Sequence, residues 1–364
     1  MSGPLQNIRI IEFGSMGPGP FACMMLADNG ADVVRVMRAT PAVMDGYISL
    51  EKDALARSRK VVRLDLKKPT DIARARELVR NADGIVEGFR PGVMEQLGLG
   101  PDVLLADNPK LVYGRMTGWG QDGPYAQSAG HDINYIALSG ALHAIGRPGQ
   151  PPVPPANLVG DFGGGGMMMA FGMVSAILHA RATGQGQIVD CSMVDGSALL
   201  MSLLYSAHAM GVWRDEYGVN MVDGGAHFYN CYETADGKFV AVGAIEPQFY
   251  GRLRHRLGIA EDPAFDDPHD PRKWDTLKIR FAEIFRSKTR EQWCEIFGYD
   301  DSCFSPVLSM REAPHHPHNV DRRTFVDVGG MMQPAPAPRY SASVNDAPTM
   351  TRDDQDDGDL VFGS

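Results

Sequence analysis

The chain of 364 residues has few cysteines and no cysteine pair. The five are odd in number and widely spaced, so the sequence indicates neither a disulfide framework nor a thiolate zinc site. His315, His316 and His318 have no carboxylate or cysteine at helical spacing, and Pro317 interrupts them. We interpret them as a surface loop and predict no metal. The motifs GxSxG, GxxxxGK[ST] and HExxH are also missing, which argues against the enzyme classes they mark.

Basic residues are outnumbered, with 35 Lys and Arg against 45 Asp and Glu, for a net charge of −10. A dedicated nucleic-acid surface is therefore not expected. The N-terminus has no basic region followed by an apolar run, and the last three residues are not a peroxisomal Ser-Lys-Leu signal. These absences favour a cytoplasmic location. The acidic segment DDQDDGD near the end is expected to be disordered.

The most apolar segment runs from Gly163 to Ala180. It begins with four glycines, contains His179 and leaves too few apolar helical residues to cross a bilayer. We interpret it as a buried helix, and no membrane partner is expected.

Short apolar runs alternate with helical patterns in the first 90 residues. The pattern predicts strands over residues 7–13, 31–36 and 61–66, and another near 83–89. Helices are expected after the Gly-Pro loop at 14–20 and over 69–81. Strand, helix and strand at this spacing form right-handed parallel crossovers, so the sequence predicts an α/β fold with an open parallel sheet.

The loop after the first predicted strand contains Gly14, Gly17 and Gly19. Their spacing differs from GxGxxG, and two prolines interrupt them. The second strand also ends on Arg38, where a nicotinamide enzyme carries an acid for the ribose hydroxyls. The sequence therefore disfavours NAD.

Basic side chains occur where the predicted strands end. Arg38, Arg59, Lys60, Arg63 and Arg90 all lie at or near the mouths of these strands. Each alone is consistent with a solvated surface residue. Several on one edge of an acidic protein favour a phosphate-rich ligand.

His131 and Asp161 lie on either side of the proline-rich segment 148–158. Each precedes a helix-like stretch, so each could be structural: a lone histidine, or an aspartate that caps a helix. Together they are candidates for acid–base chemistry. The glycine run 163–166 predicts a helix start whose bare N–H groups could stabilise developing negative charge.

The second half of the chain predicts a smaller α+β domain. Residues 228–244 alternate as two strands around a turn at Asp236-Gly237. We expect a large domain from residues 1–200 and 330–364, a linker over 201–224, a small domain over 225–310 and a return linker over 311–329.

Four segments carry a family resemblance: GPGPFACMMLADNGADVVRV (17–36), GHDINY (130–135), NLVGDFGGGG (157–166) and residues 220–250. They resemble the alpha-methylacyl-CoA racemases of the class III CoA-transferase superfamily. The resemblance extends over about residues 4–340. It implies the class III CoA-transferase fold, with a large Rossmann-like domain, a small domain and an interlocked homodimer. It also implies that the large domain of one subunit and the small domain of its partner share the active site.

The resemblance assigns roles to individual residues. His131 and Asp161 are expected to exchange the α-proton of a 2-methyl-branched acyl-CoA thioester, with the enolate stabilised by the glycine run. Glu246 is expected to act from the partner subunit; the alternative is a glutamate that merely precedes a helix, because Pro247 fits the first helical position. The CoA or substrate contacts implied are Arg38, Lys60, Val62, Arg63, Leu64, Arg90, Gly130, Asp132, Ile133, Asn134, Tyr135 and Asn157.

This hypothesis makes the protein an isomerase of lipid and fatty acid metabolism that needs no cofactor, since CoA is part of the substrate. The alternative within the superfamily is CoA transfer between acids, with Asp161 as a nucleophile. Retention of His131 favours racemisation. A binding protein without turnover is the third possibility. The 20 methionines are expected to fill the core in most cases, while a minority lines an acyl groove.

Overall fold

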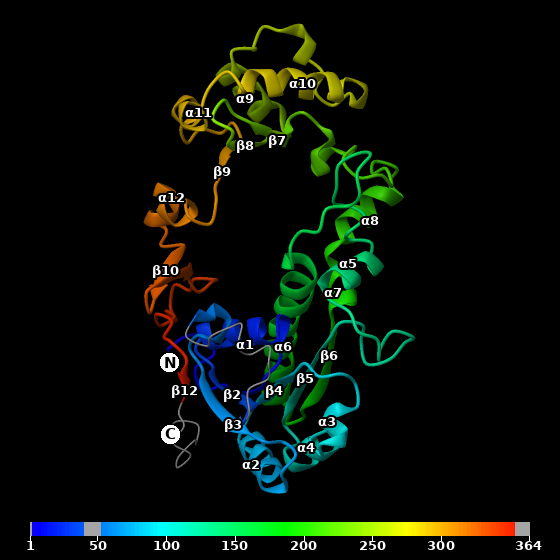
Figure 1. The fold of residues 1–364 in the computed structure, drawn as a ribbon, viewed down its shortest axis with the longest axis vertical. Coiled ribbons are helices and arrows are strands. Elements are labelled where there is room, and N and C mark those ends of the chain that lie inside the picture. The colour runs from blue at the N-terminus through cyan, green and yellow to red at the C-terminus, as the bar shows by residue number, and fades with distance from the viewer. Residues whose placement is uncertain (1, 40–51, 354–364) are drawn as a thin grey trace. The chain divides into compact units, whose positions relative to one another are not determined.

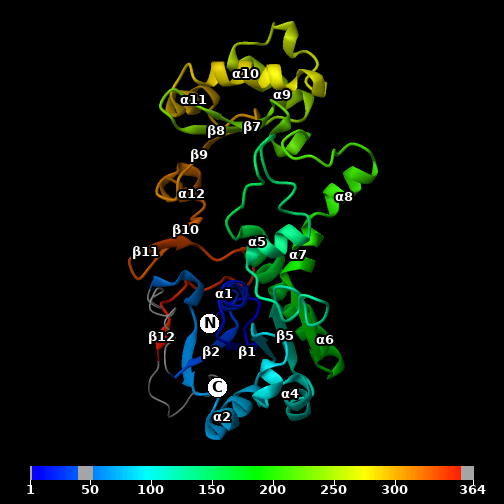
Figure 2. The same ribbon diagram turned by 45° about the vertical axis from the view of Figure 1, so that its right-hand side comes forward.

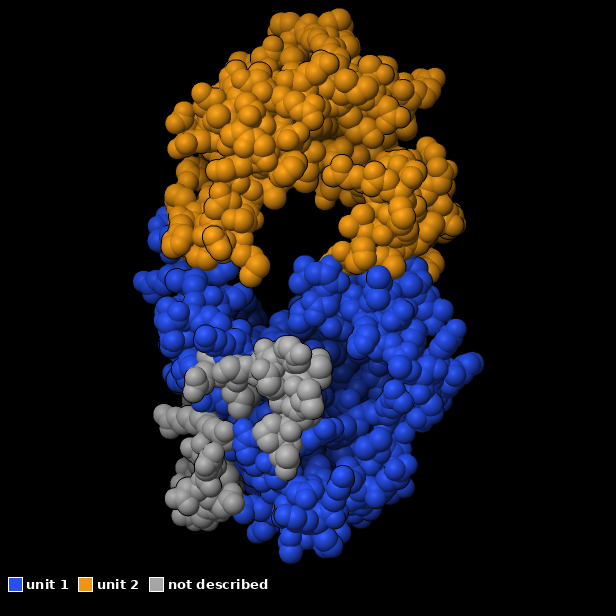
Figure 3. Space-filling view, in the orientation of Figure 1, with its two compact units in different colours: residues 1–141, 156–201, 320–364 blue, residues 142–155, 202–319 orange. Residues whose placement is uncertain are grey.

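The computed structural model describes residues 2–39 and 52–353. The acidic segment near the C-terminus begins at the last of these residues and otherwise lies outside them. The chain divides into two compact units: residues 1–141, 156–201 and 320–364 form unit 1, and residues 142–155 and 202–319 form unit 2. Figure 3 colours the two units separately. These bounds differ from the predicted domains, because the segment 142–155 belongs to unit 2 and the return to unit 1 occurs at Val320.

Unit 1 contains a seven-stranded sheet in the order β12-β3-β2-β1-β4-β5-β6, and all of its strands are parallel (Figure 1). The predicted α/β fold is confirmed. The strands are β1 (Arg9–Phe13), β2 (Asp32–Arg38), β3 (Lys60–Leu64), β4 (Gly84–Glu87), β5 (Val112–Thr117), β6 (Gln187–Ser192) and β12 (Arg352–Asp353).

Helices cover both faces of this sheet. The helices of unit 1 are α1 (Pro18–Asp28), α2 (Pro69–Arg80), α3 (Val93–Gln96), α4 (Pro101–Asp107), α5 (Asp132–Leu138), the π-helical segment η4 (Leu158–Met167), α6 (Met168–Thr183) and α7 (Met193–Leu200). Successive side chains of a strand point to opposite faces. Ile10 accordingly packs with α1 and α6, whereas Ile11 packs with α2 and α4.

The returning C-terminal segment is attached to unit 1 by a buried arginine. The Arg57 guanidinium binds both carboxylate oxygens of Asp28 and also donates to Gln333 Oε1 at 2.9 Å. Gln333 lies on β11 (Met331–Pro334), which forms a hairpin with β10 (Phe325–Val328). This contact explains why a segment distant in sequence belongs to unit 1.

Unit 2 contains an antiparallel sheet of three strands, β7 (Tyr229–Glu233), β8 (Phe239–Gly243) and β9 (Phe304–Val307), in that order. Helices α9 (Pro247–Leu257) and α10 (Trp274–Phe285) lie over this sheet (Figure 2). An aromatic core lies between them and one face of the sheet. The helices of unit 2 are α8 (Ser202–Ala209), α9 (Pro247–Leu257), α10 (Trp274–Phe285), α11 (Arg290–Phe297) and the short α12 (Pro317–Asp321). The predicted hairpin corresponds to β7 and β8.

The continuous helix Leu158–Thr183 is long and apolar enough to cross a membrane, judged by length and composition alone. The core helix of a soluble protein meets the same criterion, and 44% of the most apolar window is buried. Met169 and Met173 on this helix are fully buried in the core of unit 1.

Candidate functional site

A cavity of unit 1 with a volume of about 1250 Å³ lies where the parallel strands end. The carboxyl ends of such strands are where α/β proteins bind ligands. Loops after β1, β4 and β5 line it, together with the start of α5 and the first turn of η4. Of the predicted site residues, the cavity brings together Arg63, Arg90, Gly130, His131, Tyr135, Asn157 and Asp161.

Asp161 occupies the first turn of η4, and its carboxylate is held on one side by Asn157. The Asn157 side-chain amide donates to Asp161 Oδ2 at 3.1 Å. The pKa of Asp161 is raised, chiefly because burial disfavours the charged carboxylate, and the neighbouring charge of Asp132 raises it further. The amide of Asn157 and the charge of His131 act in the opposite direction. The protonated form of Asp161 is therefore more accessible than that of an ordinary aspartate.

His131 is exposed and precedes α5, where its extended backbone makes it the N-cap. The Asn134 side chain accepts from His131 N at 3.0 Å. The segment before His131 rests on an aromatic cluster, because Tyr135 packs edge-on against Trp119 with ring centroids 4.7 Å apart. The Tyr135 hydroxyl also donates to Gly130 O. These contacts hold the backbone at the start of α5, from which the His131 imidazole extends.

The glycine run 163–166 does not begin a helix, so that prediction is wrong. The helix starts at Leu158, and three of the four glycines are buried inside it. Their role is close packing: a Cβ at Gly164 would lie 2.5 Å from Ser197 N on α7, and one at Gly166 would lie 2.9 Å from Pro18 O on α1. The helix that starts directly after His131 is α5, where Asn134 N and Tyr135 N donate to His131 O.

The loop after β1 approaches the same carboxylate. Gly17 has φ +71°, and a Cβ there would lie 3.2 Å from Asp161 Oδ2. Only glycine fits this conformation and distance without strain. The glycines and prolines of this loop had excluded a dinucleotide fingerprint, and in the structure they bring the start of α1 to Asp161.

A buried arginine beneath the cavity was not predicted as a site residue. Arg35 on β2 lines the cavity and pairs with Glu12 on β1, Nε to Oε1, at 3.2 Å. The two residues are direct neighbours in the sheet. Arg59 binds the other oxygen of Glu12 and is also buried, so it is not the surface residue that its position suggested. The sequence signal that could have revealed this pair is the occurrence of opposite charges at corresponding positions of two apolar strands.

Several predicted contact residues lie elsewhere. Val62 and Leu64 are buried in the core, so contacts with a ligand are left to their backbone atoms. Lys60 pairs with Asp32 at 3.5 Å. Within residues 2–39 and 52–353, neither these three nor Arg38, Asp132, Ile133 and Asn134 are among the lining residues. Asp132 is buried, and its carboxylate accepts from Asp161 N at 2.8 Å.

Glu246 lies in unit 2 as the N-cap of α9, with its side chain exposed. Its charge contributes to raising the pKa of the Cys303 thiol, although burial is the larger cause. Cys303 lines a second cavity of about 710 Å³ on the open face of the three-stranded sheet, together with Tyr229, Gly243 and the loop at Asp223.

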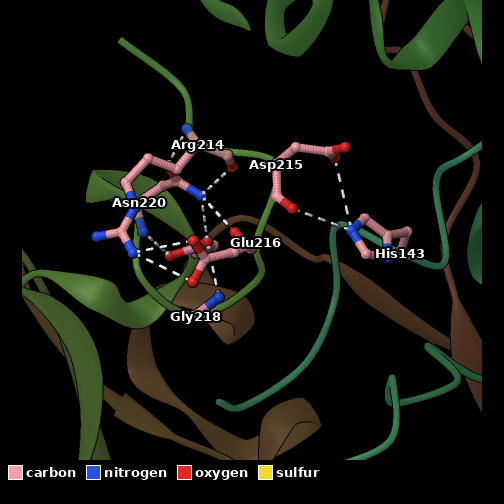
Figure 4. Close-up of polar contacts among 7 residues, drawn as sticks. His143, Arg214, Asp215, Glu216, Gly218 and Asn220 are labelled. Atoms are coloured by element: carbon pink, nitrogen blue, oxygen red, sulfur yellow. Dashed lines mark hydrogen bonds and ion pairs between the residues drawn. The ribbon is translucent and has the colours of Figure 1, made fainter. Parts of the chain in front are cut away.

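The loop bearing Asp223 is held by a network centred on Asn220, shown in Figure 4. The Asn220 amide donates to Glu216 O at 2.8 Å and to Asp223 Oδ2 at 2.9 Å, and its oxygen accepts from Arg214 N. His143 faces Asp215 across 3.5 Å, which connects the segment 142–155 to this loop. No role had been assigned to Asn220, although it begins the NMVDGG motif.

The residues described contain no cluster of three or more metal-ligating side chains. His315 ends a short helical turn, and His318 lies on α12.

The family model for CoA-transferase family III matches residues 5–355. The chain belongs to this family. It is 46% identical to the alpha-methylacyl-CoA racemase of Mus musculus, over 93% of this chain and 86% of that protein. It is 44% identical to the racemase of the same name from Homo sapiens, over 92% of this chain and 86% of the relative. The resemblance carried by the four sequence motifs is thus confirmed.

The fold is also that of the family. The structure of a CAIB/BAIF family protein from Brucella suis superimposes with a TM-score of 0.80, covering 95% of both chains at 23% identity. At that identity the comparison establishes the fold alone. The cavity at the ends of the parallel strands belongs to the unit that carries His131 and Asp161.

Proposed function

We propose that this member of CoA-transferase family III is an isomerase that racemises the α-carbon of 2-methyl-branched acyl-CoA thioesters. The observation that carries the proposal is that His131 and Asp161 line one cavity, with the pKa of Asp161 raised by its burial. The identity to two proteins named alpha-methylacyl-CoA racemase supports it.

The reaction needs two acid–base groups because the α-proton leaves one face of the carbon and returns to the other. The acidity of such a proton is weak, with a pKa on the order of 20, so the carbanion forms as an enolate that must be stabilised. In one direction neutral His131 removes the proton and protonated Asp161 supplies one to the opposite face. In the other direction the roles are exchanged.

A raised pKa suits Asp161 to this exchange. An ordinary aspartate is fully ionised at neutral pH and is a poor acid. Burial raises the pKa of Asp161 and so favours its protonated form, while the hydrogen bond from Asn157 stabilises the charged form. The pair can therefore hold one proton on either member.

The enolate oxygen needs hydrogen-bond donors, and the start of α5 offers them. The first N–H groups of a helix have no acceptor within it. In α5 the N–H groups of Asn134 and Tyr135 donate to His131 O, so the donors proposed here are Asp132 N and Ile133 N, directly after His131. We assign them the role that the sequence had suggested for the glycine run.

The cavity is lined by both positively charged and apolar side chains, which suit the CoA end and the acyl end of a thioester substrate. Arg63 and Arg90 line it, and buried Arg35 adds a further cation, which suits the phosphates of CoA. Met16, Met37, Met116 and Met193 also line it. Flexible methionines accommodate bulky branched acyl chains. No separate cofactor is required, since CoA belongs to the substrate.

The protein is proposed to act as a homodimer. Within unit 1, Phe171, Val174 and Leu178 form an exposed apolar stripe on α6, and Ile188 is exposed on the neighbouring strand β6. Within unit 2, helix α8 has no buried residue, although Leu203 and Tyr205 are apolar. A helix gains most of its stability from packing, so these faces favour a protein partner.

In this dimer the partner subunit would contribute Glu246 to the His131–Asp161 site, as the sequence resemblance implies. An exposed glutamate at a helix start is available for that contact. We assign the reaction to lipid and fatty acid metabolism, because its substrates are branched acyl thioesters, and a cytoplasmic location remains the expectation from the sequence.

Isotope exchange tests the function. One epimer of a 2-methylacyl-CoA is incubated with the protein in deuterated water, and the α-proton and the epimer ratio are followed by NMR. We expect deuterium incorporation and a mixture of epimers without any added acid. His131→Ala and Asp161→Ala should bind the thioester but lose the exchange.

The same experiment separates the alternative, CoA transfer through Asp161 as a nucleophile, for which the family is named. Absence of exchange, together with thioester transfer that requires an acceptor acid, would identify a transferase and contradict the proposal. A protein that binds acyl-CoA and does neither would be a binding protein.

A further inference from the structure

Asp132 places a second, buried carboxylate directly behind Asp161. It is the first residue of α5, and 7% of its surface is exposed. Its Oδ1 accepts a hydrogen bond from Asp161 N at 2.8 Å. The Asp132 carboxylate therefore holds the backbone of Asp161, while Asn157 holds its side chain.

A glycine makes room for this contact. A Cβ at Gly160 would lie 2.5 Å from Asp132 Oδ1, which is closer than real Cβ contacts. Any side chain at residue 160 would displace either the carboxylate or the helical turn that carries Asp161. The pairing of Gly160 with Asp132 is thus part of the local packing.

The second oxygen of this carboxylate has no hydrogen-bond partner. Asp132 Oδ2 is buried without one, within the residues that the structure describes. The position of Asp132 in the first turn of α5 allows the helix dipole to stabilise its negative charge. The charge of Asp132 raises the pKa of Asp161, although burial of Asp161 is the larger cause.

Within the described residues, the titratable groups of α5 and its cap that act on the pair are His131 and the neutral phenol of Tyr135. Arg90, from the loop after β4, acts on Tyr135. Helix α7 packs against both α5 and η4. Its only carboxylate, Asp195, is exposed and acts on Asp190 and Cys191 instead.

We propose that Asp132 is a positioning residue of the reaction: its buried carboxylate fixes the backbone of Asp161 and places a second acidic group beside the one that exchanges the proton. The Asp132 carboxylate itself exchanges no proton with the substrate. The inference rests on the proposed function, because the shared proton matters only for acid–base chemistry at His131 and Asp161.

Asp132→Asn tests the charge separately from the hydrogen bond, because the amide oxygen still accepts from Asp161 N. The measurement is kcat/KM for α-proton exchange between pH 4.5 and 9. Loss of the like charge lowers the pKa of Asp161, so the acid limb of the profile moves to lower pH, by about half to one unit. Exchange at neutral pH falls several-fold as less of the enzyme holds the proton on Asp161.

Asp195→Asn is the matched control, because it removes a carboxylate from the first turn of the adjacent helix without a contact to Asp161. Its acid limb should remain in place. If Asp132→Asn lowers the rate at every pH and leaves the acid limb unmoved, Asp132 is only structural and the proposal is overturned. Wild-type protein that exchanges no α-proton would contradict the proposed function instead.

Carboxyl carbon NMR covers the case in which Asp132→Asn fails to fold. In wild-type protein with labelled aspartate, Asp161→Asn identifies the Asp161 signal by its loss. That signal should titrate above the usual aspartate range, because burial and the charge of Asp132 both disfavour the ionised carboxylate. If it titrates within the usual range, the proposal is overturned.

Discussion

The side-chain amide of Asn157 donates a hydrogen bond to Asp161 Oδ2 at 3.1 Å, and both residues line the large cavity of unit 1. This bond favours the charged carboxylate, so it opposes the effects of burial and of Asp132 on the pKa of Asp161. Asp161 is held between an amide that stabilises its charge and a carboxylate that repels it.

Asn157→Ala should therefore move the pH profile of the reaction in the opposite direction to Asp132→Asn. Without the amide the pKa of Asp161 rises further, so the acid limb of kcat/KM moves to higher pH. The carboxylate also loses its orientation, and we expect kcat to fall by about 10- to 100-fold. The pH dependence of α-proton exchange measures both effects.

Asn81→Ala is the control for that variant. Asn81 is exposed, caps the end of α2 and does not line the cavity. It should leave rate and pH profile unchanged. An acid limb that moves to lower pH in Asn157→Ala would contradict the assigned role of the amide.

Gly17→Ala should impair the site through sterics. Its backbone has φ +71°, ψ −112°, and the added Cβ would lie 3.2 Å from Asp161 Oδ2. We expect a loss of about 1 to 3 kcal/mol in the free energy of unfolding and a loss of activity beyond that caused by unfolding. Denaturant unfolding and exchange kinetics on the same preparation measure the two.

Gly92→Ala provides a comparison. Gly92 also precedes a helix with positive φ, but nothing lies within 4 Å of its added Cβ. It should cost about 1 kcal/mol of stability and leave kcat unchanged. Equal activity losses in both variants would exclude a specific contact between Gly17 and Asp161.

Glu87 should make stability fall as the pH rises. Burial raises the pKa of Glu87 from 4.5 to about 7, although Phe89 N and Arg115 favour its charge. Because its pKa is raised on folding, the stability it contributes is complete below about pH 4.5 and is lost as the pH rises through about 7. The loss amounts to about 3 kcal/mol at most, at about 1.4 kcal/mol per pKa unit.

Glu87→Gln imitates the protonated form. It should match the wild-type protein at pH 5 and exceed its free energy of unfolding at pH 8, as measured by urea titration at both values. In the half-buried ion pair of Arg76 with Asp107, the arginine lowers the pKa of the carboxyl, so Asp107→Asn should show no such gain at pH 8. A loss of stability in Glu87→Gln at pH 8 would mean that its pairing with Arg115 outweighs burial.

Arg90→Ala should weaken binding of the CoA thioester more than it slows the chemistry. Arg90 lines the cavity in the loop after β4, and a charge-assisted contact to phosphate is typically worth about a factor of 10. We expect KM to rise by roughly that factor with kcat nearly unchanged, and the difference from wild type to shrink at high salt.

Arg80→Ala is its control, since Arg80 pairs with Asp107 on the outside of unit 1 at 3.7 Å. Arg38→Ala, measured alongside, tests the contact that the sequence resemblance implies for that residue. If Arg90→Ala leaves KM unaltered, the phosphates bind elsewhere.

The proposed dimer predicts that a charge on its apolar faces will separate the subunits. Leu178→Asp and Leu203→Asp alter side chains that are 70% and 73% exposed. Each should therefore leave the fold intact but convert a dimer into a monomer in analytical ultracentrifugation. The monomer should lose activity, because each site would lack the partner's Glu246.

Ile279→Asp is the control, since Ile279 is 61% exposed on α10 of unit 2, outside those faces. A wild-type protein that sediments as a monomer and still exchanges the α-proton would contradict both the dimer and the shared site.

The parallel sheet and the acid–base pair were predictable from sequence because their signals are local. Apolar strands and amphipathic helices alternate along the first 90 residues, and each strand corresponds to a predicted run. His131 and Asp161 occur in motifs long enough to identify the family. The resemblance is confirmed, while the roles of the individual residues stay predictions.

The contacts that tune the site depend on residues that meet only in the folded chain. Asp132 and Asp161 are 29 residues apart and become neighbours because α5 packs against η4. The glycine run was predicted to start a helix, because the sequence shows that glycine lacks a side chain but not what packs against it. In the structure these glycines allow close packing against α7 and α1. Arg59 was consistent with a solvated surface residue, yet it is buried against Glu12, which also pairs with Arg35 at the matching position of the next strand.

The sequence by itself determined the fold class and the family, because hydrophobic periodicity and motifs can be recognised without a structure, and it predicted His131 and Asp161 as the acid–base pair. Only the tertiary structure decided which groups surround Asp161. Burial and like charge raise its pKa and Asn157 lowers it, and each effect depends on distances of a few ångströms between separate elements. Local sequence carries no information about those distances until the helices pack.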